Sequence, residues 1–240
     1  MTGTIYELFI AAAVFVGSHF GIASTALRDE LVRRLGERAY LGLFSAVSLI
    51  LLAWLVRAYV RVDDSLVLWI RPPLLTVLPI VVMPLALLLL VCGYTQRNPT
   101  AVMQGKPLRT DRPAPGILAI TRHPLLWGIG LWAIVHLIIS DDVASIVFFG
   151  AFAILALYGT RMLDAKKQRT WPPEDWQRFA AATSNIPFAA LFTSRNEFRI
   201  AEIGWWRIML VGVLDIALMI LHPNVLGTLV GVDFFSHAPS

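Results

Sequence analysis

The chain has 240 residues, of which 57% are hydrophobic, and its mean hydropathy is +0.69. Several apolar runs approach the roughly 20 residues that an α-helix needs to cross a bilayer. This composition excludes an ordinary water-soluble domain and predicts an all-α polytopic membrane protein. A single cysteine excludes both a disulfide framework and a cysteine metal cluster.

Six membrane spans are predicted within one membrane domain, residues 1–240. The first lacks a basic start, so it should be a retained span and not a cleaved signal. The fourth is short and is followed by Asp141 and Asp142, which need water, so spans four and five should form a tight hairpin. Pro79 and Pro84 predict curvature or a kink in span three. In chain order the spans cover about residues 5–26, 40–60, 74–95, 124–140, 143–163 and 205–230.

The distribution of Lys and Arg predicts the orientation of the chain in the membrane. Basic residues gather after spans one, three and five, whereas the amino terminus, the Asp141-Asp142 turn and the carboxyl tail have none. The positive-inside rule then places both termini on the periplasmic side of a bacterial inner membrane. Because topology accounts for the net charge of +4, we expect the lipid bilayer and no nucleic acid as partner.

The long cytoplasmic connection between spans five and six contains a predicted amphipathic helix. Pro173 and Glu174 mark its start, and it extends to about Thr183. One interpretation is a cytoplasmic lid. The other is an interfacial strut whose aromatic side chains rest among the lipid headgroups, namely Trp171, Trp176 and Phe179.

Two histidines fall inside predicted spans, His19 in the first and His136 in the fourth. An imidazole is costly in hydrocarbon, so each is a candidate for ligand, metal or proton work. Gly128, Trp132 and His136 are four residues apart and share one helix face. This stripe is either a wall for a planar cofactor with His136 as axial ligand, or a site of close helix packing at Gly128.

Other ionisable side chains are second candidates. Arg122 and His123 precede Pro124, which suits a first helical turn, so both should lie at the cytoplasmic start of span four. His123 and His222, near opposite faces of the membrane, are alternatives to the two central histidines as ligands. Asp215 in span six either hydrogen-bonds another helix or serves a proton relay or a ligating histidine.

Several short motifs occur together in the segments 17–19, 27–28, 36–45, 122–124, 131–136, 181–190 and 222–223. In combination they resemble the NnrU family and the related zeta-carotene isomerases of plants and cyanobacteria. The resemblance implies, for NnrU proteins, a membrane protein of nitrite and nitric oxide respiration, and for the isomerases a haem b enzyme acting on a cis double bond.

The resemblance implies a haem b whose iron is ligated by His19 and His136. We expect four further residues near the cofactor: Trp132 and Gly128 from the helix stripe, and His123 and Arg122 from the start of span four. The isomerases carry a cysteine one turn before the second histidine, where this chain has Ala133. At about 1.5 Å per residue the two histidines lie at different depths, so one iron between them requires tilted or offset helices.

The Arg-His-Pro motif also resembles isoprenylcysteine carboxyl methyltransferases, which use S-adenosylmethionine. Their pattern expects paired glutamates after a downstream arginine, whereas Arg161 is followed by Asp164, Lys166 and Lys167. We therefore predict an NnrU-type protein that binds haem b and serves nitrite and nitric oxide reduction, as a redox or isomerase-type enzyme or as a maturation factor of a reductase. The first alternative is a haem-dependent cis–trans isomerase of a lipophilic substrate, like the zeta-carotene isomerases. The second is a membrane methyltransferase that uses S-adenosylmethionine.

Overall fold

The computed structural model describes residues 4–23, 26–63, 65–101 and 114–230. Within them, nine α-helices are accompanied by short 3-10 segments at residues 73–76, 116–119 and 200–202. The α-helices are α1 (Ile5–Ala23), α2 (Ala26–Leu35), α3 (Glu37–Val60), α4 (Val77–Thr95), α5 (Pro124–Ile139), α6 (Val143–Thr170), α7 (Pro173–Ala182), the single-turn α8 (Ala189–Phe192) and α9 (Trp205–Val230).

The six predicted spans correspond to α1, α3, α4, α5, α6 and α9. Five of them are long and apolar enough to cross a membrane, and α5 is a shorter apolar helix of 16 residues. The chain is therefore an all-α, multi-pass membrane protein. The predicted amphipathic helix is also confirmed, as α7.

Two predicted spans differ from the observed helices. The first was expected to reach residue 26, but α1 ends at Ala23 and the separate polar helix α2 begins at Ala26. The fifth was expected to end near residue 163, but α6 continues to Thr170. Apolar character ends at Leu163, whereas helix-compatible residues continue without Gly or Pro up to Pro172. Hydropathy marked the limit of the membrane segment and not the limit of the helix.

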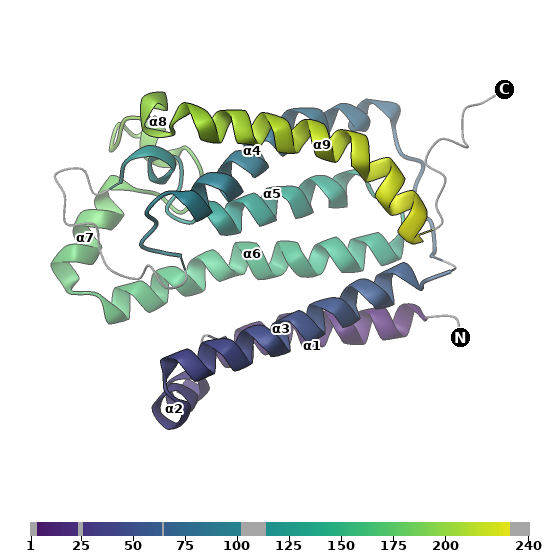
Figure 1. The fold of residues 1–240 in the computed structure, drawn as a ribbon, viewed down its shortest axis with the longest axis horizontal. Coiled ribbons are helices and arrows are strands. Elements are labelled where there is room, and N and C mark those ends of the chain that lie inside the picture. The colour runs from purple at the N-terminus through teal and green to yellow at the C-terminus, as the bar shows by residue number, and fades with distance from the viewer. Residues whose placement is uncertain (1–3, 24–25, 64, 102–113, 231–240) are drawn as a thin grey trace.

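The spanning helices are arranged around α6, which packs on α5 on one side and on α1 on the other (Figure 1). Beyond α5 come α4 and then α9, and α3 packs against α1. This order leaves α3 and α9 at the two flanks. Hydrophobic side chains on both remain exposed, which suits contact with lipid acyl chains.

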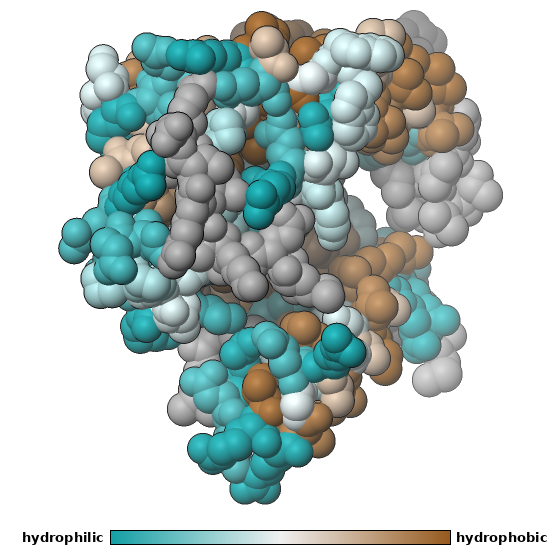
Figure 2. Space-filling view, turned by 60° about the vertical axis from the view of Figure 1, so that its left-hand side comes forward, coloured by the Kyte–Doolittle hydropathy of each residue, from teal (hydrophilic) through white to brown (hydrophobic). Residues whose placement is uncertain are grey.

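The two ends of the bundle differ in polarity. At the polar end lie α2, α7 and α8 together with the connections that follow α4 and α6 (Figure 1). At the turn end lie the start of α1, the α5–α6 turn and the end of α9. The face turned forward in Figure 2, over the polar end, is largely hydrophilic, and hydrophobic residues lie on the flanks behind it. The described parts of the three basic connections thus lie at the same end of the bundle, the polar end. That this end faces the cytoplasm stays a prediction.

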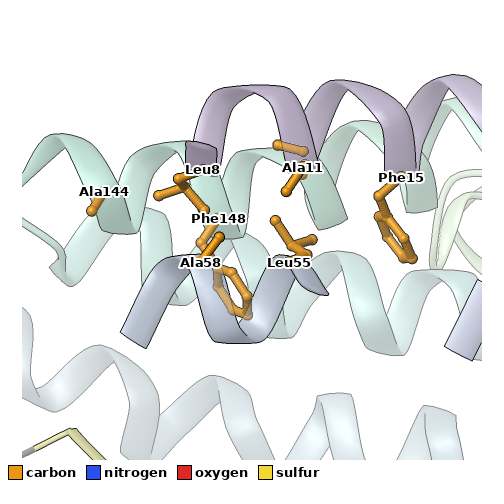
Figure 3. Packing of buried hydrophobic residues seen from close by; sticks show 9 residues of the cluster. Leu8, Ala11, Phe15, Leu55, Ala58, Ala144 and Phe148 are labelled. Carbon is orange, nitrogen blue, oxygen red and sulfur yellow. The ribbon is translucent and has the colours of Figure 1, made fainter. Parts of the chain in front are cut away.

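The first buried cluster joins α1, α3 and α6 (Figure 3). Small side chains such as Ala11, Ala58 and Ala144 let the helix backbones approach closely, and larger ones such as Leu8 and Leu55 fill the remaining space. This packing attaches the α1–α3 pair to the central helix.

The second buried cluster lies at the polar end and includes residues of α4 and α7. It contains Leu89 and Cys92 of α4, Ile117 and Leu118 of the 3-10 segment before α5, Trp171 in the α6–α7 connection, and Phe179 of α7. Phe179 is only 2% exposed and Trp171 7%. These two rings are therefore buried in protein, which differs from the interpretation that places them among lipid headgroups.

The predicted tight hairpin between spans four and five is observed as the turn 140–142, and it supplies a testable helix cap. Asp142 accepts hydrogen bonds from the backbone N–H of Ser145 at 3.0 Å and from the Ser65 hydroxyl at 2.7 Å. Burial raises the pKa of Asp142, but these hydrogen bonds outweigh burial and hold it below its usual value. The cap therefore stabilises the fold above the ordinary Asp pKa and loses its effect as the pH falls below it.

We expect Asp142→Ala to lower the free energy of unfolding by about 1 kcal/mol because it removes this cap. Denaturant unfolding in detergent at neutral pH measures the loss. Asp141→Ala is the matched control, since its carboxylate only approaches Arg71 at 3.5 Å on the surface and should matter less. Equal losses in the two variants would contradict a capping role for Asp142.

Candidate functional site

The Arg-His-Pro segment closes the bundle at the polar end. Pro124 is the first residue of α5, and His123 occupies the N-cap position. The backbone N–H of Arg122 donates to the carbonyl of Ser184 at 2.9 Å, and the hydroxyl of Thr100 donates to the carbonyl of Arg122 at 2.7 Å. The start of α5 is thus tied to the chain after α4 and to the chain after α7.

Asp164 of α6 joins these segments through both carboxylate oxygens. Its Oδ1 lies 2.7 Å from Nε2 of His123. Its Oδ2 accepts from the side-chain amide of Asn185 at 3.3 Å and lies 3.5 Å from Nη1 of Arg122. We call these four residues the polar-end cluster. Asp164 was not among the predicted site residues, although a carboxylate directly after the apolar run of α6 could have indicated it.

Burial sets the protonation of the polar-end cluster. It lowers the pKa of His123, and the hydrogen bond to Asp164 only partly offsets this effect. Burial likewise lowers the pKa of Arg122, against the opposing charge of Asp164. A neutral His123 that donates from Nε2 leaves Nδ1 as an acceptor. Among the described residues, this atom and Nε of Arg122 are buried and have no hydrogen-bond partner. The Arg122 guanidinium lies 5.5 Å from the centre of the Trp176 ring.

The lowered pKa of His123 predicts acid sensitivity. Because the unfolded chain binds this proton more readily, the contribution of neutral His123 to stability is complete above about pH 6.5 and is lost as the pH falls below it. We expect the melting temperature in detergent to decrease between pH 7.5 and pH 5.5. His123→Asn should reduce that decrease, and an unchanged pH dependence in the variant would contradict the assignment.

His136 lies at the turn end, three residues before the end of α5. Its Nδ1 is 2.8 Å from the carbonyl oxygen of Trp132. The ring stacks on Phe149 of α6 with centroids 4.6 Å apart, and the ring of His222 on α9 lies 6.2 Å away. If Nδ1 carries the proton, Nε2 is the available lone pair, as in ligating histidines whose other nitrogen is held by a carbonyl.

His19 is held in the same way on α1, but at another level of the bundle. Its Nδ1 is 2.7 Å from the carbonyl oxygen of Phe15. Phe20, the next residue, contacts Tyr158, nine residues further along α6 than the Phe149 that stacks on His136. At about 1.5 Å per residue these two contacts lie roughly 13 Å apart along α6. His19 and His136 therefore lie at different levels of the bundle.

Gly128 faces α4. A Cβ at this position would lie 2.7 Å from Cγ of Leu90 and 2.9 Å from the carbonyl oxygen of Ala86. Trp132, by contrast, contacts the aromatic residues of α6. Of the two interpretations of the Gly128–Trp132–His136 stripe, close helix packing fits Gly128, and a cofactor-facing role is left to Trp132 and His136.

The described residues contain no group of three or more His, Cys, Asp or Glu side chains arranged to hold a metal ion. A bare metal ion would thus lack a closed set of protein ligands within this part of the chain. Asp215 is half-buried on α9. The two ends of α5 instead carry different chemistry: a charged cluster at the polar end and an aromatic-flanked imidazole at the turn end.

The chain resembles known proteins over most of its length. Residues 7–230 match the NnrU protein family. The chain belongs to the NnrU family. It is also 30% identical over 191 residues to the chloroplastic 15-cis-zeta-carotene isomerase of Arabidopsis thaliana, covering 76% of this chain and 49% of the plant protein. The chain thus spans about half the length of that relative. No solved structure matches.

The NnrU match begins within α1 and includes the whole of α3, α4, α5, α6 and α9. Both ends of α5, with the polar-end cluster and His136, therefore lie inside the NnrU region. So does His222, on α9.

Proposed function

We propose that this NnrU-family protein is a haem b-dependent membrane enzyme that isomerises a long, lipophilic polyene. The observation that carries the proposal is the setting of His136: an imidazole within the bundle, anchored through Nδ1 to a backbone carbonyl and with Nε2 unused. The relationship to an enzyme named for a 15-cis-zeta-carotene substrate supports the choice of reaction.

The donor set fits a haem better than a bare metal ion. Nε2 of His136 would hold the haem, and the Trp132 and Phe149 rings, with centroids 5.2 and 4.6 Å from that of His136, would flank this imidazole and limit water. When bound, haem supplies an iron centre that can interact with the π-electrons of a double bond and ease its rotation. His19 fits as a ligand by its own geometry, but its offset from His136 leads us to assign the iron to His136.

The chain's own residues have two tasks in this reaction. At the turn end, the Trp132 carbonyl orients the His136 imidazole so that Nε2 faces away from its own helix backbone. At the polar end, Asp164 and its partners fix where α5 begins and hence the depth at which it carries His136. A substrate of this class would enter from the bilayer, because the flank of α9 exposes apolar side chains such as Ile216 and Met219.

Isomer analysis of a reconstituted reaction tests the proposed activity. Haem-loaded protein in lipid vesicles is incubated with 15-cis-zeta-carotene under reducing and oxidising conditions, and the isomers are separated by chromatography. We expect haem-dependent loss of the 15-cis isomer, abolished in His136→Ala and retained in the surface variant Asp141→Ala. No conversion by haem-loaded wild-type protein in either redox state would contradict the proposal.

The family match favours one second candidate, support of a nitrite or nitric oxide reductase during its maturation. A deletion strain measures this role directly. If deletion lowers reductase activity and the His136→Ala variant does not restore it, the maturation role depends on this histidine. Full reductase activity in the deletion strain would exclude the maturation role.

A further inference from the structure

We propose that the polar end carries a binding site for an anionic phosphate group, held by Lys167 of α6 and by Arg122. The phosphate belongs either to a lipid headgroup or to a small soluble compound, since both present the same charged oxygens. The site lies at the opposite end of α5 from His136 and is independent of the proposed haem. The inference begins from two cationic side chains that the fold buries near one carboxylate, that of Asp164.

Lys167 is buried without an ion-pair partner in the described part of the chain. Only 8% of the residue is exposed, and its ammonium lies 5.1 Å from the centre of the Trp171 ring. Asp164, three residues earlier on α6, is engaged by the other members of the polar-end cluster. Burial and, secondarily, the charge of Lys166 lower the pKa of Lys167 to about 8. Because a lysine is rarely buried unless it is paired, this ammonium calls for an anion.

Arg122 supplies the second positive charge beside it. Its guanidinium lies 5.5 Å from the centre of the Trp176 ring on α7, and that ring lies 6.3 Å from the ring of Trp171. The two cations therefore stand over neighbouring indoles at the place where α7 follows α6 (Figure 1). The side chain of Arg122 keeps 12% of its surface exposed, so an anion can reach it from solvent.

Charges on the surrounding elements make this region attractive to an anion. The charge of Lys167 contributes to the lowered pKa of His123, and that of Arg195 contributes to the lowered pKa of Arg122. Arg195 follows α8, and its guanidinium donates to carbonyl groups at the end of α7. Three cations of the described chain thus influence the region, and the charge of Asp164 can balance only one of them.

The position of Lys167 along α6 matches the level of lipid phosphates. The apolar run of α6 ends at Leu163, and Lys167 follows four residues later, roughly 6 Å further along the helix axis. The headgroup layer on each side of a bilayer is roughly 5–8 Å thick. Basic pockets between spanning helices at this level are suited to the headgroups of anionic lipids.

The arrangement of the donors favours phosphate over carboxylate. The ammonium of Lys167 and the guanidinium of Arg122 come from different elements and approach a bound anion from different directions. A phosphate group presents its oxygens on a tetrahedron and can serve both donors at once, whereas the two oxygens of a carboxylate lie in one plane.

Thermal unfolding of the full chain in detergent tests the site with two separate probes, dioleoylphosphatidylglycerol and inorganic phosphate, at constant ionic strength. The first presents the phosphate on a lipid and the second presents it free. Dioleoylphosphatidylcholine, whose choline balances the phosphate charge, is the lipid control. We expect at least one anionic probe to raise the melting temperature, and Lys167→Met to weaken its apparent affinity roughly tenfold through loss of one charge-assisted contact.

Lys166→Met is the matched control. It removes the same charge from the adjacent position of α6, but Lys166 lies near charged groups of the α2 region, among them Asp29 and Glu37. This variant should therefore keep the wild-type affinity. Methionine retains the apolar length of the lysine stem, so packing on Trp171 should survive in Lys167→Met. Stabilisation by the phospholipid alone assigns the site to a headgroup, and stabilisation by inorganic phosphate with the same dependence on Lys167 assigns it to a soluble compound.

Stabilisation by neither anionic probe would overturn the proposal. So would equal losses of affinity in Lys167→Met and Lys166→Met, which would indicate general attraction to a basic surface. If Lys167→Met does not fold, lysine labelling of the wild-type protein decides. An amine-reactive reagent followed by peptide mass spectrometry should modify Lys167 more slowly when the stabilising probe is present, with Lys166 unaffected. Equal labelling of Lys167 with and without the probe would reject the site.

Discussion

Asp164→Ala is expected to lower the free energy of unfolding by about 3 kcal/mol, because removing one partner of a buried ion pair leaves the other charge uncompensated. Asp164 is the shared acceptor for His123, Arg122 and Asn185. The His123 side chain is fully buried, and that of Arg122 is only 12% exposed, so water cannot readily replace the lost carboxylate. Denaturant unfolding of the detergent-solubilised protein measures the effect.

Asp164→Asn is the matched control for this prediction. The amide keeps one acceptor oxygen and the shape of the side chain but loses the charge, so its cost should fall between those of wild type and Asp164→Ala. If Asp164→Ala lowers the free energy of unfolding by less than about 1 kcal/mol, the Asp164–Arg122 pair contributes no more than an ordinary surface ion pair. That result would contradict the role of the polar-end cluster in fixing the start of α5.

Gly128→Ala is the second substitution with a large expected effect. The added Cβ would lie 2.9 Å from the carbonyl oxygen of Ala86, a backbone atom that cannot rotate away, and 2.7 Å from Cγ of Leu90. The α4–α5 contact must therefore open, and we expect a loss of about 2–3 kcal/mol in stability, as for other overpacked sites. Thermal unfolding in detergent and resistance to proteolysis report the change.

Gly150→Ala provides the control within the same protein. Gly150 also lies inside a spanning helix, α6, but a Cβ there meets nothing within 4 Å. Its replacement should be neutral or stabilising by up to about 1 kcal/mol, because Ala is the better helix former. Equal stability of the two variants would show that α4 and α5 are not closely packed at Gly128.

The fold could be predicted from the sequence because the thickness of the bilayer sets the length of the apolar runs. The span predicted at about residues 205–230 agrees with α9 as observed. The continuation of α6 beyond Leu163 was missed, because hydropathy reports the membrane boundary and is silent about a helix that continues into water. The helix α7 was predicted, but the burial of Phe179 depends on the cluster it joins, and its ring contacts Trp171.

The site was predictable only in part. Helical periodicity places Trp132 and His136 on one face, and the structure keeps them in contact. The pairing of His123 with Asp164, 41 residues away, and that of His136 with His222 depend on which helices pack together. A one-dimensional pattern does not contain that information.

The absorption spectrum of detergent-purified protein from haem-replete cells tests the haem assignment most directly. We predict a Soret band that shifts on reduction with dithionite in the wild-type protein. His136→Ala should lose or markedly shift this band while keeping the helical content measured by circular dichroism. A well-folded but colourless wild-type protein, or a His136→Ala variant with the wild-type spectrum, would contradict haem ligation by His136.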